Sequence, residues 1–176
     1  MDQTLKERAS GIRMLLLDVD GVLTDGKLYF DHNGNEIKAF DTRDGLGIKS
    51  LQRSGIEVAV ITGRKSNAVT QRMNQLSIAH VYQGREDKLS AFMDLLDKTG
   101  LEAGQVCYAG DDWIDIPVLL RVGLAVSVAD ADSLVKEHAH WITERKGGDA
   151  AVREICNLIL KAQGKDKTIM DEILAL

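Results

Sequence analysis

The sequence predicts an α/β fold, a doubly wound, Rossmann-like parallel sheet with helices on both faces. Apolar runs of strand length alternate with amphipathic runs of helix length along the chain, which is typical of a parallel sheet. At 176 residues, with 44% hydrophobic and 28% charged residues, the chain is long enough for one domain with a sizeable core. We expect a single domain over residues 1–164 and a C-terminal tail over 165–176.

Six apolar runs are expected to form the strands of this sheet. They cover residues 12–18, 56–61, 79–82, 105–109, 124–128 and 140–143. The helices are expected over residues 45–54, 66–77, 87–99, 114–122, 131–138 and 149–163. Ser66 is a candidate N-cap and Pro117 suits a first helical turn, while Gly55, Gly100 and Gly123 suit helix ends.

One segment interrupts the alternation of strands and helices. Residues 27–40 hold two short β-prone runs on either side of an Asn-Gly pair, which is typical of a hairpin turn. The sequence therefore predicts a small β-hairpin insertion. Its apolar side chains would be exposed on a monomer, so we expect them to contact other subunits; the alternative is a hairpin folded back on its own domain. These side chains belong to Leu28, Tyr29, Phe30, Ile37 and Phe40.

The chain leaves no room for a separate cap domain. Segments shorter than about 40 residues seldom form an independent domain. The 43 residues between Asp18 and Thr62 must supply a helix and a strand besides the hairpin. The 25 residues between Thr62 and Lys88 are already used by one helix and one short strand. We therefore expect a capless domain.

Carboxylates follow two of the predicted strands. Asp18 and Asp20 come where the first strand ends, and Asp111, Asp112 and Asp115 follow the fourth. The carboxyl ends of parallel strands form the edge where open α/β folds bind ligands. Paired carboxylates there can hold a divalent cation or divide the roles of nucleophile and acid/base. Alone, the first pair could equally be an ordinary Asp-Gly turn.

Two further signals favour an anion site at the same edge. Thr62, Gly63 and Arg64 end the second predicted strand, where a hydroxyl and backbone N–H groups can face an anion. Lys88 begins a predicted helix, although a single lysine there is most often a solvated surface residue. With the carboxylates, these residues predict a site for a metal ion and a phosphoryl group.

In this order, the four signals resemble the haloacid dehalogenase superfamily of phosphotransferases. That family has Asp-x-Asp after the first strand, Thr or Ser after the second, Lys at a helix start and an acidic pair after the next strand. The match spans residues 12 to about 130. Segments beginning at Asp18, Phe40, Ile61 and Lys146 further resemble the capless 3-deoxy-D-manno-octulosonate 8-phosphate phosphatases, almost end to end.

The resemblance implies a Mg²⁺-dependent phosphatase that hydrolyses 3-deoxy-D-manno-octulosonate 8-phosphate through an aspartyl-phosphate, in lipopolysaccharide precursor biosynthesis. Asp18 would be the nucleophile, and Asp20 would protonate the leaving alkoxide and then activate water. Mg²⁺ would be held by the carboxylates of Asp18 and Asp111 and by the Asp20 backbone carbonyl. Thr62 would hydrogen-bond the phosphoryl group, and Lys88 would help to neutralise its charge.

Other polar residues are expected around these groups. Asp112 and Asp115 would orient the metal ligands rather than bind the ion. A sugar acid also carries a carboxylate, which a planar Arg side chain recognises best, although the sequence does not decide which Arg does so. The substrate-binding candidates are Asp20, Asp41, Thr42, Arg43, Asp44, Gly45, Lys49, Arg64, Arg72 and Lys88. For Arg72, a solvated position on the helix surface is an equal alternative.

Other functions remain open at this point. A phosphatase for a nine-carbon, sialic-type sugar acid 9-phosphate shares the scaffold, and only the resemblance separates the two substrates. A phosphoacceptor signalling domain uses similar residues, but its acceptor follows a middle strand, and no single Asp ends residues 56–61 here. A non-catalytic interaction module would tolerate the loss of one element, yet all are present.

Composition restricts the partners and the compartment. The net charge of −5 argues against a general nucleic-acid binder, and no apolar run reaches the length of a membrane span. Residues 1–8 have no apolar signal core, so we expect a cytoplasmic enzyme with reduced Cys107 and Cys156. The resemblance implies a homotetramer with sites completed by neighbouring subunits. Residues 165–176 would then dock at a neighbour's site; the alternative is a frayed terminus.

Overall fold

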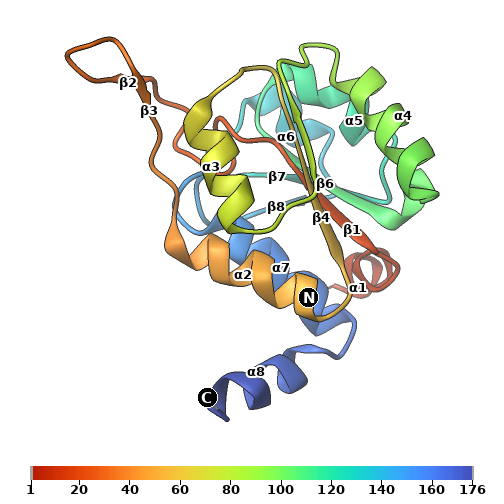
Figure 1. Ribbon diagram of the computed structural model, residues 1–176. Helices are drawn as coiled ribbons and strands as arrows, with labels where there is room; N and C mark the ends of the chain where they lie inside the picture. The colour runs from red at the N-terminus through yellow and green to blue at the C-terminus, as the bar shows by residue number, and fades with distance from the viewer. Residues whose placement is uncertain (1, 176) are drawn as a thin grey trace.

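The computed structural model describes residues 2–175, and a sheet of six parallel strands lies at its centre. The order across the sheet is β5-β4-β1-β6-β7-β8 (Figure 1). The strands are β1 (Met14–Leu17), β4 (Glu57–Thr62), β5 (His80–Gln83), β6 (Val106–Gly110), β7 (Leu124–Ser127) and β8 (Trp141–Ile142). All six predicted strands are present, and the predicted α/β fold is confirmed.

Helices cover both faces of the sheet (Figure 1). One face carries α1 (Gln3–Ser10), α2 (Thr42–Arg53), α3 (Asn67–Gln75) and α7 (Ala151–Ala162). The other carries α4 (Lys88–Thr99), α5 (Ile116–Leu119) and α6 (Ser133–Glu137). β1 is covered by helices on both faces of the sheet and is paired with β4 on one side and β6 on the other. All four of its residues are therefore 0% exposed. Among the described helices, none is long and apolar enough to cross a membrane.

Two helices have boundaries that differ from the predicted ones, and the capping hydrogen bonds at their starts explain the difference. α2 begins at Thr42 rather than residue 45, because the Asp41 side chain accepts a hydrogen bond from the Arg43 backbone N–H at 2.7 Å. The helix predicted over 114–122 is shorter and divided. A 3₁₀ turn, η2 (Trp113–Asp115), precedes α5, and a reciprocal capping box between Asp112 and Asp115 closes that turn. A second turn, η1 (Ala103–Gln105), leads into β6.

The predicted hairpin is present and projects from the body of the domain (Figure 1, upper left). Its strands, β2 (Tyr29–Phe30) and β3 (Glu36–Ile37), are antiparallel and two residues long. Phe30 is 59% exposed and Ile37 is 52% exposed, as expected for a hairpin with no core of its own. Phe40 differs from this expectation, since it packs against the domain core. Within residues 2–175 the hairpin is the only insertion, and no separate cap domain forms.

The C-terminal tail forms a helix, α8 (Asp166–Leu174), and it is anchored. Ile169 is 7% exposed and packs into the core, and α8 contacts α7. The frayed terminus considered from the sequence is therefore wrong for α8, while Leu176 lies outside the described residues. Figure 1 shows α8 at the end of the molecule opposite the hairpin.

Candidate active site

The register of the sheet brings the predicted site residues to one edge. Leu17 of β1 lies opposite Val60 of β4 and Ala109 of β6. Thr62 and Asp111 each lie one residue beyond the position opposite Asp18, so the three side chains leave neighbouring strands at nearly the same level. The Asp18 backbone N–H donates to the Ala109 carbonyl at 3.0 Å, which extends the β1–β6 pairing to the nucleophile candidate.

Lys88 lies buried between two carboxylates. Its Nζ is 2.9 Å from Oδ2 of Asp18 and 2.6 Å from Oδ1 of Asp115, and the residue is 1% exposed. The solvated lysine considered as an alternative is therefore wrong. Burial acts to lower the pKa of Lys88, but the charges of Asp18 and then Asp115 outweigh burial and raise that pKa above its ordinary value. The side chain is thus a fixed ammonium beside Asp18.

Asp115 organises the loop that carries Asp111. One of its oxygens accepts from Lys88 and from the Tyr108 hydroxyl at 2.6 Å. The other accepts the backbone N–H groups of Asp111 at 2.9 Å and Asp112 at 3.1 Å. Asp115 is 0% exposed, so these contacts satisfy a carboxylate that water cannot reach. Tyr108 was not among the predicted residues, because a tyrosine inside an apolar strand has no motif that marks it.

The acidic cluster fits a hard divalent cation. Oxygens of Asp18, Asp111 and Asp115 lie within 4.8 Å of one another. Oδ1 of Asp111 is buried without a hydrogen-bond partner among the described residues. Because both Asp115 oxygens already accept hydrogen bonds, Asp18 and Asp111 are the carboxylates best placed to bind a metal. A Cβ at Gly21 would lie 2.0 Å from Oδ2 of Asp111, so the turn beside this cluster admits only glycine.

Both candidate metal ligands hold protons more tightly than free aspartates do. Burial raises the pKa of Asp18 from 3.8 to about 7, with Lys88 opposing the shift and Asp115 adding to it. Burial raises the pKa of Asp111 from 3.8 to about 8, and the charges of Asp18 and Asp115 add to it. A bound cation would supply the positive charge that protons otherwise provide.

We expect Mg²⁺ to stabilise the protein more at high pH than at low pH. Because the pKa values of both carboxyl groups are raised on folding, their protonation stabilises the folded, metal-free protein. This stabilisation is complete below pH 3.8 and is lost as the pH rises through about 7 to 8. Mg²⁺ replaces the lost protons, so the rise in Tm on adding Mg²⁺ should be larger at about pH 8.5 than at about pH 5.5. Calorimetry of the parent and of Asp111→Asn measures this. An equal Mg²⁺ response at both pH values, or a full response in Asp111→Asn, would contradict the assignment.

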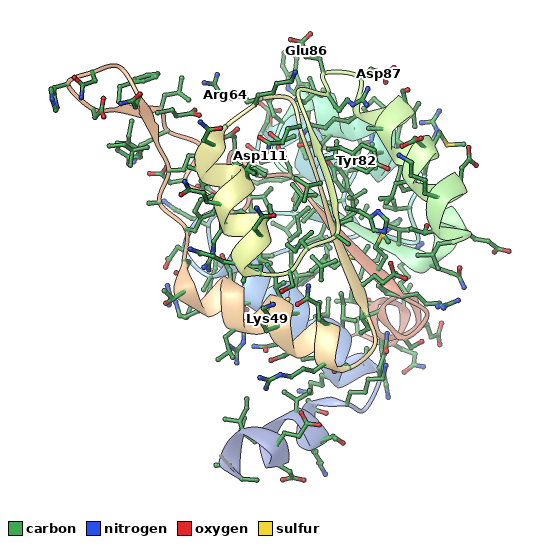
Figure 2. All side chains as sticks on the ribbon, in the orientation of Figure 1. Lys49, Arg64, Tyr82, Glu86, Asp87 and Asp111 are labelled. Atoms are coloured by element: carbon green, nitrogen blue, oxygen red, sulfur yellow. The ribbon has the colours of Figure 1, made fainter. Side chains whose placement is uncertain are left out.

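Thr62 and Arg64 lie at the same edge. Thr62 is 2% exposed, and its hydroxyl accepts the Arg64 backbone N–H at 3.4 Å. The Arg64 side chain reaches the hairpin, where it pairs with Glu36 at 3.1 Å. Figure 2 shows Arg64 and Asp111 at the hairpin end of the sheet, and Lys49 on α2 at the distant end.

The predicted substrate-binding residues Arg43, Asp44 and Lys49 of α2 have different surroundings. Arg43 lies at the start of α2, where it pairs with Asp41 at 2.6 Å and Asp149 at 2.7 Å. Asp44 and Lys49 follow it along α2. Asp44 is 1% exposed and accepts the Arg153 backbone N–H at 2.7 Å, and Lys49 donates to the Leu76 carbonyl at 2.6 Å. The structure therefore does not bring Lys49 to the other site residues.

Arg72 and Gly45 mark a close approach of α3 to α2. A Cβ at Gly45 would lie 2.5 Å from Nη2 of Arg72. The guanidinium lies 6.0 Å from the centroid of the Phe40 ring, and Nη1 donates to Gln75 at 3.4 Å. Arg72 is therefore a partly packed side chain rather than a freely solvated one. Thr42 is the first residue of α2 beside the Asp41 cap.

Comparisons with known proteins agree with this geometry. A model of the haloacid dehalogenase-like hydrolases matches residues 77–155. 3-Deoxy-D-manno-octulosonate 8-phosphate phosphatase KdsC of Salmonella typhi is 53% identical over 158 residues, which are 90% of this chain and 84% of that protein. The chain belongs to this phosphatase family of the haloacid dehalogenase-like hydrolases.

Solved structures of the phosphatase family superimpose closely on this chain. The 3-deoxy-D-manno-octulosonate 8-phosphate phosphatase of Yersinia pestis is 49% identical, with a TM-score of 0.93 over 95% of this chain and 90% of that one. The enzyme from Moraxella catarrhalis is 40% identical, with a TM-score of 0.94 over 97% of this chain and 99% of that one. The latter was solved with magnesium, phosphate and KDO.

Two contacts at the edge of this phosphatase site involve residues outside the predicted catalytic, metal and substrate-binding residues. Lys38, from the hairpin, donates to Oδ1 of Asp20 and lies 3.3 Å from Glu36. Gly147 packs so tightly on the nucleophile loop that a Cβ there would lie 1.7 Å from the Gly21 carbonyl oxygen. The Gly-Gly pair in this loop was recognised only as part of the family resemblance. No local pattern marks Lys38, because its partner is 18 residues away.

Proposed function

We propose that this protein is a Mg²⁺-dependent phosphatase that converts 3-deoxy-D-manno-octulosonate 8-phosphate to the free sugar acid and phosphate, a step in lipopolysaccharide precursor biosynthesis. The observation that carries the proposal is the buried Asp18–Lys88–Asp115 arrangement beside Asp111 at the sheet edge. The 53% identity to the Salmonella typhi phosphatase supports the choice of substrate.

In the proposed mechanism, a carboxylate oxygen of Asp18 attacks phosphorus and the bond from phosphorus to the sugar oxygen breaks. Asp20 gives its proton to the leaving oxygen. Water then attacks the phosphorus of the aspartyl-phosphate, Asp20 takes a proton from that water, and phosphate leaves with Asp18 restored. Lys88 holds Oδ2 of Asp18 and places a positive charge beside the transferring group, while the Thr62 hydroxyl hydrogen-bonds that group.

Mg²⁺ would be held by the carboxylates of Asp18 and Asp111 and by the Asp20 backbone carbonyl. Bound there, it would neutralise charge on the phosphoryl oxygens. Asp115 positions Asp111 through the backbone N–H of that residue, and Asp112 closes the η2 turn beside it. These contacts support a role for Asp112 and Asp115 in orienting the metal ligands rather than in binding the ion.

The substrate preference is tested by steady-state kinetics of the purified protein with two sugar acid phosphates. We expect kcat/KM for the eight-carbon 8-phosphate to exceed that for the nine-carbon, sialic-type 9-phosphate by about tenfold or more. Multiple turnovers per subunit would also distinguish a phosphatase from a phosphoacceptor signalling domain. Equal or reversed preference would contradict the substrate assignment, and a single stoichiometric phosphorylation would contradict the enzyme assignment.

We also propose that the subunits assemble into a homotetramer through their hairpins. The exposed Leu28, Tyr29, Phe30 and Ile37 form an apolar surface on a ribbon with no core of its own, which supports this arrangement. A capless site also needs another means of excluding water, and a neighbouring subunit would provide it. Residues 1–164 would form the catalytic domain, with 165–176 as an appended tail.

The assembly is tested by light scattering on a Phe30→Ser/Ile37→Ser double variant. We expect the parent to be a tetramer. The variant should form a smaller species, because the two substitutions remove apolar surface from the hairpin. Leu120→Ser is the matched control, since Leu120 is 62% exposed but lies outside the hairpin. A monomeric parent, or a hairpin variant that remains tetrameric, would reject this proposal.

A further inference from the structure

The hairpin places a buried lysine against Asp20, the proposed acid and base. The Lys38 side chain is 1% exposed, and the Asp20 side chain is 21% exposed. Nζ of Lys38 donates to Oδ1 of Asp20 and lies 3.3 Å from Oε1 of Glu36. The ammonium therefore lies between two carboxylates, one from the loop after β1 and one from β3.

The contact is part of a line of alternating charges. Glu36, whose side chain is 14% exposed, also accepts from Arg64 at 3.1 Å. The order Asp20, Lys38, Glu36, Arg64 joins the loop after β1, the base of the hairpin and the loop after β4. A buried ammonium between two carboxylates keeps its position, because moving it would leave charges unpaired away from water.

Lys38 and Lys88 contact different carboxylates. Lys88 is paired with Asp18 and Asp115, whereas Lys38 contacts Asp20 and Glu36. An ammonium group only donates hydrogen bonds, so Oδ1 of Asp20 is the acceptor in this contact. Lys38 thus leaves Oδ2 as the oxygen of Asp20 that is available for proton transfer.

We propose that Lys38 is a positioning residue for proton transfer by Asp20. By holding Oδ1, it fixes the rotation of the carboxyl group and leaves Oδ2 to give a proton to the leaving oxygen. The inference rests on the role of Asp20 in the proposed function. It adds that the hairpin takes part in the chemistry of its own subunit, through a side chain at its base.

The test compares leaving groups that differ in their need for a proton. The sugar alkoxide of an alkyl phosphate must be protonated as it leaves, whereas the nitrophenolate of p-nitrophenyl phosphate leaves without a proton. The parent, Lys38→Met, Lys38→Arg and the control Lys27→Met are assayed with both substrates. Lys27 is also in the hairpin segment, but its side chain is 72% exposed and pairs with Asp25 rather than Asp20.

We expect Lys38→Met to lose about tenfold or more of kcat/KM on the sugar acid phosphate, with a much smaller loss on p-nitrophenyl phosphate. The ratio of the two values is measured on one preparation, so it does not depend on the fraction of the variant that folds. Lys38→Arg retains a donor and should restore part of the ratio. Lys27→Met should keep the parent's ratio.

An equal loss on the two substrates, or no loss in Lys38→Met, would overturn the inference. An unchanged ratio in Lys38→Arg together with an unchanged ratio in Lys38→Met would do the same. Failure of the proposed function looks different, because the parent itself would then show no preference for the sugar acid phosphate. In that case the same ratio is measured with the alkyl phosphate that the parent hydrolyses best.

Discussion

Asp18→Asn is expected to lower kcat on the sugar acid phosphate by at least about a thousandfold. The amide keeps the shape of the carboxylate but is a poor nucleophile toward phosphorus. Lys88 retains Asp115 at 2.6 Å, so the buried ammonium keeps one carboxylate partner and the domain should remain folded. The measurement is phosphate release under saturating substrate, with circular dichroism to verify the fold.

A matched control separates this effect from a general change of charge. Asp97→Asn removes one exposed carboxylate from α4, away from the sheet edge, and should leave kcat within about twofold of the parent. Near-normal turnover in Asp18→Asn would rule out Asp18 as the nucleophile. A variant that is inactive because it is unfolded would be recognised from its spectrum and would be replaced by Asp18→Glu, which moves the carboxylate without removing its charge.

Removal of divalent cations is expected to abolish turnover, and Mg²⁺ is expected to restore it. Asp18, Asp111 and Asp115 lie within 4.8 Å of one another at a buried edge, and Lys88 balances only part of their charge. Ca²⁺ should support activity poorly, because it is larger and less demanding of octahedral geometry. The assay is phosphate release after EDTA treatment and desalting, with each ion added back.

Two outcomes of the metal experiment would count against the proposed Mg²⁺ site. Full activity in excess chelator would reject the metal site. Equal restoration by Ca²⁺ and Mg²⁺ would show that the site only supplies charge and does not depend on the geometry of the ion. Asp111→Asn provides a second check, since it should need far more Mg²⁺ for the same turnover.

The sequence was sufficient for the central sheet because its strands are buried on both faces. Met14 to Leu17 form a continuous apolar run, and such runs are recognised without long-range information. Helix boundaries were less predictable where polar side chains decide them. The Asp41 cap makes α2 begin earlier than predicted. The helix α1 was not predicted, because it is short and only Ala9 in it is buried.

The position of the site could be predicted from the order of the strands more than from any local pattern of residues. Asp18, Thr62 and Asp111 end neighbouring strands, so any parallel sheet with this order places them together. The contacts of Lys38 and Tyr108 could not be predicted in this way. The contact of Lys38 depends on the path of the hairpin, and the contact of Tyr108 depends on the Asp115 side chain pointing into the domain. Both features are set by tertiary packing.

The role of Asp18 as nucleophile is tested most directly by trapping the phosphorylated enzyme. The parent and Asp18→Asn are mixed with the sugar acid phosphate and Mg²⁺, quenched in acid within the first turnover and digested for mass spectrometry. Nucleophilic attack by Asp18 predicts a phosphoryl group on the peptide that contains Asp18 in the parent, and none on that peptide in the variant. Phosphate released in the first turnover without any phosphorylated peptide, or a phosphoryl group on a different residue, would contradict it.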